Sequence, residues 1–256
     1  METMSVRLEF HGDLVALLKR NENKPETARL LFRTACAKDL IESQGVPHTE
    51  VGYITTGEGC ECSFMYIPRF GETLHVWAHT PPVDVTRATL LFPNPLEDVS
   101  FIVDVNVGRL AKLLRLAGFD TLYHPDWDDD RIAEIAEGEG RIVLTRDREL
   151  LKRNAVTWGR LVRTSDPWDQ FGEIVSFFGL EERIELFSRC PTCNGILEAV
   201  EKEEIIDRLE PLTRLMYNTF TRCPRCGQIY WRGSHHSHIR EKLAASLKKS
   251  IFDPKG

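Results

Sequence analysis

The sequence predicts an α/β protein built around a parallel sheet with flanking helices, with a smaller module on each side of it. Three observations predict this class. From residue 98 onward, short apolar runs alternate with helical patterns, as in βαβ units. The first 95 residues hold several short strand candidates and one helix, which indicates a small α+β unit. After residue 186, two Cys-x-x-Cys pairs indicate a metal-stabilised module.

Length and composition bound the function. With 256 residues, the chain has room for two or three domains and a substantial core. It has no uncharged apolar run long enough to span a membrane and no signal-peptide pattern, so we expect a cytoplasmic protein without a membrane partner. The net charge of −6 argues against broad, nonspecific coating of nucleic acid, but a local basic patch can still bind phosphate.

The N-terminal module is expected to mix strands with one helix. A strand is predicted over residues 6–10 and a helix over 28–41, and the strand candidates that follow are 51–55, 63–67 and 74–80. The proline-containing stretch 81–95 marks the end of this module.

The central domain alternates strands and helices in order. Strands are predicted over 101–103, 120–123, 141–145 and 160–164, and helices over 108–117, 130–137, 148–153 and 168–178. Gly118 is the expected stop of the first of these helices. The sequence Ser165-Asp166-Pro167 has the form of an N-cap followed by proline at the first helical position.

Acidic residues fall where two of these strands end and where one helix starts. Asp104 follows the first strand, Asp147 follows the third, and Asp128, Asp129 and Asp130 open a helix. Ligands of open parallel sheets bind outside the carboxyl ends of the strands, so Asp104 and Asp147 should meet at one rim. Carboxylates that converge there repel one another unless a cation lies among them, and Mg²⁺ or Mn²⁺ suits oxygen ligands.

Each acid also has a structural explanation. The aspartates at 128–130 can cap a helix and favour its dipole, and Asp147 can cap the helix that begins after it. Asp104 is not needed as a helix cap, because it lies three or four residues before the helix. A carboxylate at the end of a buried strand is costly if it is left unpaired. Arg109, Lys112 and Arg115 recur on the polar side of the first helix, either as a solvated face or as phosphate contacts.

The cysteines give the strongest single signal. Of the seven cysteines, four form the pairs Cys190/Cys193 and Cys223/Cys226, which 29 residues separate. Four thiolates at this spacing predict a tetrahedral zinc site, and a closed site of this kind is structural rather than catalytic. Cys36, Cys60 and Cys62 lie far from these pairs and are expected to be free.

Several segments of the chain resemble those of a known protein family. The segments FIVDVNVGRLAKLLRLAGFDTLY, DDRIAEIAEGEGRIVLTRDREL, RCPTCNGIL and RCPRCGQIYWRGSH resemble, in order, the Mut-seven C-terminal RNase family, a PIN-like domain followed by a zinc ribbon. The segment KDLIESQGVPHTEVGYI resembles the ubiquitin-like β-grasp module found at the N-terminus of this bacterial family. Sulfur carriers share that module, but they act through a C-terminal Gly-Gly that this chain lacks.

The resemblance implies a PIN-like nuclease domain that hydrolyses RNA with Mg²⁺ or Mn²⁺, and a structural Zn²⁺ in the ribbon. It implies domains at 1–95, 98–185 and 186–256, with a basic tail in the last. The catalytic acids it implies are Asp104, Asp129 and Asp147. Asp130 is an alternative to Asp129, and Asp166 is a further acid whose sequence context favours a cap. The substrate contacts we expect are Arg109, Lys112, Arg115 and Arg146.

One departure and one rival stay open. PIN nucleases commonly take the second acid from a more distant helix, whereas here it must come from residues 128–130. The tail from Arg232 to Lys249 is basic, and Tyr230 and Trp231 beside it either stack RNA bases or pack the ribbon. The rival is a noncatalytic RNA-binding or adaptor protein whose β-grasp module docks a protein partner. Phosphotransfer is disfavoured, because Asp104-Val105-Asn106 lacks the second aspartate that haloacid-dehalogenase-like phosphatases need.

Overall fold

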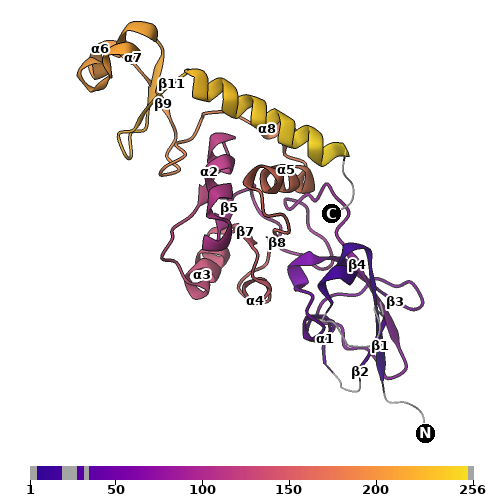
Figure 1. The fold of residues 1–256 in the computed structure, drawn as a ribbon. Coiled ribbons are helices and arrows are strands. Elements are labelled where there is room, and N and C mark those ends of the chain that lie inside the picture. Colours follow the sequence, from indigo (N-terminus) through magenta and orange to yellow (C-terminus); the bar gives the residue numbers. More distant parts are fainter. Residues whose placement is uncertain (1–4, 19–27, 32–34, 253–256) are drawn as a thin grey trace.

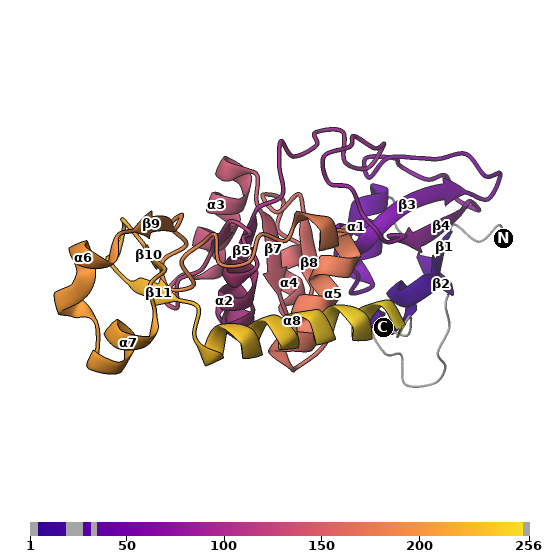
Figure 2. The same ribbon diagram turned by 90° about the horizontal axis from the view of Figure 1, so that it is seen from above.

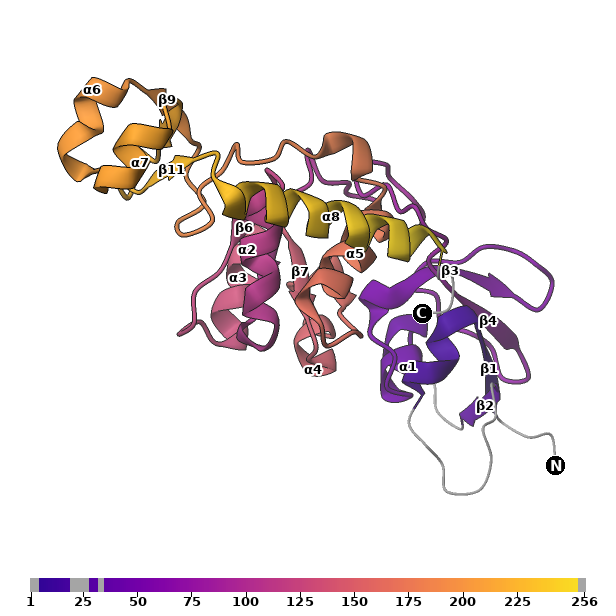
Figure 3. The ribbon, with the colours of Figure 1, turned by 45° about the horizontal axis from the view of Figure 1, so that its top comes forward.

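The computed structural model describes residues 5–18, 28–31 and 35–252. Figure 1 shows three parts in a row: the first sheet at one end, the parallel sheet in the middle and the ribbon at the other end. Figures 2 and 3 show the same order from two other sides. In the described part of the chain, none of the helices combines the length and the apolar character that a membrane crossing requires.

The first sheet has the strand order β2-β1-β4-β3. β1 runs parallel to β4, whereas β2 and β3 are antiparallel to their neighbours. Val6, Leu8 and Phe10 alternate toward the buried side, which is what a half-buried strand requires. The elements of this part are β1 (Val6–His11), η1 (Gly12–Leu17), β2 (Ala28–Leu31), α1 (Ala37–Ser43), η2 (His48–Glu50), β3 (Val51–Thr56) and β4 (Thr73–Ala78).

Two predictions for this part are wrong. The helix predicted over 28–41 begins only at Ala37, because residues 28–31 pair with β1 as strand β2; residues 32–34 lie outside the described residues. The strand predicted over 63–67 does not form. Instead, the carbonyl groups of Phe64 and Tyr66 accept hydrogen bonds from the first amides of α1, which have no partner inside the helix.

The central sheet is fully parallel, with the order β6-β5-β7-β8. Its elements are β5 (Phe101–Val103), η3 (Val105–Val107), α2 (Gly108–Leu116), β6 (Thr121–Leu122), α3 (Asp129–Glu139), β7 (Ile142–Thr145), α4 (Arg148–Leu151), β8 (Gly159–Leu161), α5 (Pro167–Phe178) and η4 (Glu181–Arg183). The chain order reverses at β5, since β6 lies on one side of it and β7 on the other. A ligand crevice is therefore expected at the carboxyl ends of β5 and β7.

Helix α2 ends where the sequence predicts. Gly118 adopts φ 97°, a conformation that favours glycine, and the amide of Phe119 returns to the carbonyl of Leu114. A Cβ atom at Gly118 would lie 2.7 Å from the carbonyl oxygen of Glu185, so the glycine also lets the chain leading to the ribbon pass close by.

The ribbon contains a three-stranded antiparallel sheet with the order β11-β10-β9. Its elements are β9 (Glu198–Val200), α6 (Lys202–Ile205), η5 (Ile206–Arg208), α7 (Pro211–Met216), β10 (Phe220–Arg222) and β11 (Ile229–Trp231). The basic tail forms a helix, α8 (Ser234–Phe252), that lies along α5 of the central domain (Figure 1). The side chains of His235, His236, Lys248 and Lys249 in this tail lie outside those described.

The described residues form two hydrophobic clusters. The larger one continues from the first sheet through the central domain, and Leu243 of α8 belongs to it. The smaller one consists of Val200, Ile205, Leu209, Phe220 and Ile229 in the ribbon. The ribbon therefore has little apolar core of its own, which fits a module held together by a metal.

Candidate active site and metal centre

Asp104 lies directly after β5, and its side chain is buried at 5% exposure. Its Oδ2 atom accepts a hydrogen bond from the hydroxyl of Thr145 at 2.6 Å and another from Asn106 Nδ2 at 2.5 Å. Among the described residues, Oδ1 receives no hydrogen bond. This second carboxylate oxygen is therefore available to a water molecule or a cation.

Thr145 and Asn106 connect the ends of β5 and β7. Thr145 is fully buried, and its hydroxyl oxygen accepts a hydrogen bond from the amide of Asp147 at 2.8 Å. The amide of Arg146 donates to Asn106 Oδ1 at 3.0 Å. The predicted meeting of the two strand ends is thus built through these two uncharged residues. Sequence reasoning missed both as site residues, because neither titrates nor occupies a recognisable ligand position.

Asp129 and Asp147 lie at the starts of helices beside this rim. Asp147 is the N-cap of α4 and accepts a hydrogen bond from the amide of Glu149 at 2.7 Å. Asp129 is the first residue of α3. The pKa of Asp129 is raised by burial and by the negative charges of Asp147, Asp104 and Asp130, and Arg153 opposes this rise. The acids are therefore close enough to repel one another.

The three acids are less tightly gathered than the cysteines are. Among the described residues, two sets of side chains bring three or more ligand atoms within 4.8 Å of one another: the four ribbon cysteines, and Glu9 with His11 and His75. Asp104, Asp129 and Asp147 do not form such a set. A metal ion bound at this rim would have to take some of its ligands from water or substrate, as Mg²⁺ commonly does.

The other predicted acids have structural partners. Asp130 forms an ion pair with Arg153, and its side chain is 83% exposed. Asp128 caps α3 by accepting a hydrogen bond from the amide of Arg131. Asp166 caps α5 by accepting hydrogen bonds from the amides of Trp168 and Asp169, as its sequence context indicates.

A cleft of about 540 Å³ opens next to the acidic rim. Arg109 and Lys112 of α2 lie on its wall and are exposed. Tyr123 also lines the cleft and lies against Gly108, where an added Cβ atom would be 2.6 Å from the Tyr123 hydroxyl oxygen. The lining residues are Val105, Asn106, Val107, Gly108, Arg109, Ala111, Lys112, Arg115, Tyr123, Ser165, Pro167, Gln170, Pro191 and Thr192. The cleft therefore extends from the loop after β5 to the first cysteine pair.

The structure places Arg115 differently from the other predicted substrate contacts. It is 5% exposed, and Nε donates to the carbonyl oxygen of Thr121 at 2.8 Å. Its Nη1 atom donates to the carbonyl oxygens of Pro191 and Thr192 at 3.3 and 3.0 Å. These contacts attach the first cysteine pair to the central domain. Arg146, by contrast, is exposed beside the acidic rim.

The four ribbon cysteines have the geometry of a zinc site. Cys190 Sγ lies 3.7 Å from Cys226 Sγ, and Cys193 Sγ lies 3.3 Å from Cys223 Sγ. Tetrahedral zinc with bonds of about 2.3 Å to sulfur places its ligands roughly 3.8 Å apart, which the first distance matches and the second falls below. The hydroxyl of Tyr230 lies 3.0 Å from Cys190 Sγ. Tyr230 therefore packs against the cysteine cluster.

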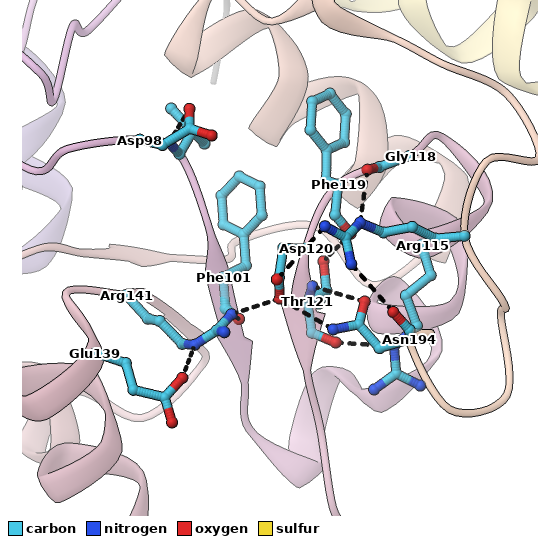
Figure 4. Close-up of polar contacts among 12 residues, drawn as sticks. Asp98, Phe101, Arg115, Gly118, Phe119, Asp120, Thr121, Glu139, Arg141 and Asn194 are labelled. Carbon is cyan, nitrogen blue, oxygen red and sulfur yellow. Dashed lines mark hydrogen bonds and ion pairs between the residues drawn. The ribbon is translucent and has the colours of Figure 1, made fainter. Parts of the chain in front are cut away.

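Figure 4 shows the polar contacts by which Asn194, the residue after the first cysteine pair, joins the central domain at β6. Asn194 Oδ1 accepts a hydrogen bond from the amide of Thr121, and Asn194 Nδ2 donates to Asp120 at 2.9 Å. Arg141 donates to the same Asp120 oxygen at 2.7 Å. Burial raises the pKa of Asp120, but the hydrogen bonds from Arg141 and Asn194 lower it more, so the pKa falls below its ordinary value. No sequence pattern indicated this contact.

Two family descriptions match the chain. The Mut7-C RNAse domain matches residues 99–243, which is more than half of the sequence, and the Mut7-C ubiquitin domain matches residues 3–84. The chain belongs to the Mut7-C RNAse domain family. The resemblance noted from the motifs is thereby confirmed for both parts. The Mut7-C RNAse match includes the parallel sheet, all four ribbon cysteines and the first half of α8. No curated protein and no solved structure gives a significant match.

Proposed function

We propose that this chain is a divalent-metal-dependent ribonuclease whose reaction centre is the rim formed by Asp104, Asp129 and Asp147. The observation that carries the proposal is the state of Asp104. Its Oδ2 is fixed by Thr145 and Asn106, while Oδ1 receives no hydrogen bond among the described residues, and the charges of Asp104 and Asp147 both act on Asp129. Mg²⁺ and Mn²⁺ prefer carboxylate oxygens as ligands, so the residues present fit such an ion.

In this proposal each side chain has a defined task. Asp104, Asp129 and Asp147 hold the ion, and a divalent ion bound there supplies an activated water molecule and neutralises charge on the phosphate. Asn106 and Thr145 keep the Asp104 carboxylate oriented by donating hydrogen bonds to it. Arg109, Lys112 and Arg146 contact the phosphates of RNA from the cleft and the adjacent rim. Arg115 is assigned no contact with substrate, because it is buried and its Nε and Nη1 atoms donate to backbone carbonyl groups.

The supporting modules have tasks of their own in the proposal. Zn²⁺ bound by the four ribbon cysteines holds the ribbon in shape, and the ribbon completes one wall of the cleft through Pro191 and Thr192. The ubiquitin-like module offers a surface to a protein partner. We also propose a cytoplasmic location, since a four-thiolate zinc site is suited to a reducing compartment.

The proposal is tested by RNA cleavage. Purified zinc-loaded protein is incubated with end-labelled single-stranded and structured RNA in Mg²⁺, in Mn²⁺, without added divalent ion and in chelator with zinc content checked, beside an Asp104→Asn, Asp147→Asn double variant. Cleavage should require the divalent ion and disappear in the double variant. The matched control is Asp126→Asn, since Asp126 is an exposed acid of the central domain that lies outside the rim. Cleavage that survives in the double variant would refute the assignment.

One observation favours a second candidate, a noncatalytic RNA-binding or adaptor protein. The three acids do not gather within 4.8 Å, and Asp129 and Asp130 both face Arg153. An adaptor should bind RNA equally well with and without Mg²⁺. Folded protein that binds RNA in chelator and cleaves none under any of the tested conditions would favour this candidate.

A further inference from the structure

The first sheet carries a cluster of metal-ligating side chains that the ribonuclease proposal does not use. Glu9 and His11 are separated by one residue on β1 and so point to the same face of the sheet. His75 lies on β4, where it is the direct register partner of Glu9 in the parallel pairing. All three side chains are half-buried. Two adjacent strands thus present two imidazoles and one carboxylate at one point.

The distances within this cluster match those between the ligands of one ion. His11 Nε2 lies 3.1 Å from His75 Nδ1, and His75 Nδ1 lies 3.4 Å from Glu9 Oε2. Zinc bound tetrahedrally at about 2.0–2.1 Å separates its nitrogen and oxygen ligands by roughly 3.3 Å. One atom from each of the three residues lies within 4.8 Å of the others, as in the cysteine cluster.

Neighbouring side chains hold the ligands in place. The ring of Trp77 stacks on His11, with centroids 3.9 Å apart and planes 13° apart. Tyr53 in turn stacks on Trp77, with centroids 5.5 Å apart. Arg7 Nε donates to Glu9 Oε1 at 2.7 Å, which leaves Oε2 facing His75. Outer partners of this kind orient the first ligands of metal sites and raise their affinity.

We propose that Glu9, His11 and His75 bind one divalent transition-metal ion, zinc in the first instance, at a site separate from the ribbon cysteines. Two imidazoles and a carboxylate suit zinc, nickel, cobalt and copper, and are a poor set for Mg²⁺. Three protein ligands leave the fourth tetrahedral position to water or to a ligand atom of a bound molecule. The ion would also join β1 to β4. This inference does not depend on the ribonuclease activity.

The test is a calorimetric titration of the full-length chain. The ribbon cysteines are first loaded with one equivalent of zinc, and further Zn²⁺ is then added, with Ni²⁺ as a second probe and Mg²⁺ as a negative one. We expect one additional equivalent of Zn²⁺ or Ni²⁺ to bind at this cluster, whereas any Mg²⁺ binding should be the same in the wild type and in variants of the cluster. The His11→Gln and His75→Gln variants should each weaken that second event by about tenfold or more.

Control variants distinguish metal binding at this cluster from metal binding elsewhere and from loss of the fold. His124→Gln removes an exposed histidine of the central domain and should leave the second event unchanged. Glu9→Gln keeps the shape of the side chain and should weaken binding as the histidine variants do. Because the three side chains are half-buried on a sheet surface, these variants should retain the wild-type circular dichroism. No second event in the wild type, or an unchanged one in His75→Gln, would overturn the proposal.

Discussion

Asn194 Oδ1 accepts a hydrogen bond from the amide of Thr121 at 3.1 Å and thereby gives a partner to β6, an edge strand of the parallel sheet. Glu50 does the same at the opposite edge, where Oε1 accepts a hydrogen bond from the amide of Leu161 in β8 at 2.7 Å. Unpaired edges are prone to aggregation, and proteins cover them in various ways. Here the ribbon covers one edge and the ubiquitin-like module covers the other.

Asn194→Gly should destabilise the protein by about 1–3 kcal/mol, because Asp120 and the Thr121 amide both lose a buried partner. Glycine is the informative replacement, since Asn194 has φ 69° and glycine adopts that conformation without strain. Chemical denaturation measures the change in the free energy of unfolding, and zinc content confirms that the cysteine site is intact. A variant as stable as the wild type would show that Asn194 contributes nothing to docking.

Glu50→Gln should destabilise the protein by about 3 kcal/mol, because Glu50 is fully buried and its partners Arg160 and Arg163 would keep their charges. Glu149→Gln is the matched control: its ion pair with Lys152 involves a largely exposed carboxylate, and its loss should cost less than about 1 kcal/mol. Denaturant unfolding of the two variants gives the comparison. Equal losses would mean that the buried pair has no special role between the modules.

Asp129→Asn should stabilise the metal-free protein slightly at neutral pH. The pKa of Asp129 is raised in the folded state by burial and by the neighbouring acids, so its ionisation opposes folding above that pKa. The gain should fade as the pH falls and wild-type Asp129 becomes protonated. It should not exceed roughly 0.5 kcal/mol, because the side chain is partly solvated. Added Mn²⁺ should reverse the order by stabilising the wild type more than the variant. Thermal unfolding across pH, with and without Mn²⁺, measures both effects.

Chelation of zinc should unfold the ribbon and spare the parallel sheet. The ribbon cluster has five buried hydrophobic residues, whereas the sheet belongs to the larger core. Hydrogen exchange should become fast in β9, β10 and β11 after chelation and stay slow in β5 and β7. Cys223→Ser should give the same pattern without a chelator. Uniform loss of protection would show instead that the two parts unfold as one unit.

The features that depend on local sequence patterns could be predicted from the sequence. The parallel sheet follows from the alternation of strands and helices, and the positions of Asp104 and Asp147 follow from where β5 and β7 end. The contacts between modules could not be predicted, because they join residues far apart in the chain: Asn194 and Thr121 differ by 73 positions, and Glu50 and Leu161 by 111. The helix predicted over 28–41 was wrong at its start for the same reason, since pairing of residues 28–31 with β1 outweighed helical periodicity, while the part from Ala37 is helical.

Three basic residues of α2 follow one sequence pattern but have different surroundings in the structure. Arg109, Lys112 and Arg115 share a helical spacing, but Arg109 and Lys112 are exposed in the cleft while Arg115 is buried against the ribbon. The Arg109→Ala, Lys112→Ala double variant should therefore weaken RNA binding and reduce the dependence of log K on log salt by about two, with little change in stability.

Arg115→Ala should have the opposite profile. It should destabilise the protein by about 1–3 kcal/mol, because the buried Thr121 carbonyl and the carbonyl groups of Pro191 and Thr192 lose their donor, and it should leave the salt dependence of RNA binding unchanged as long as the protein is folded. Binding titrations over a range of salt concentrations and denaturant unfolding measure the two properties. If Arg115→Ala reduced the salt dependence as the double variant does, its guanidinium would have to reach RNA phosphate, and the ribbon would have to separate from α2 to allow it.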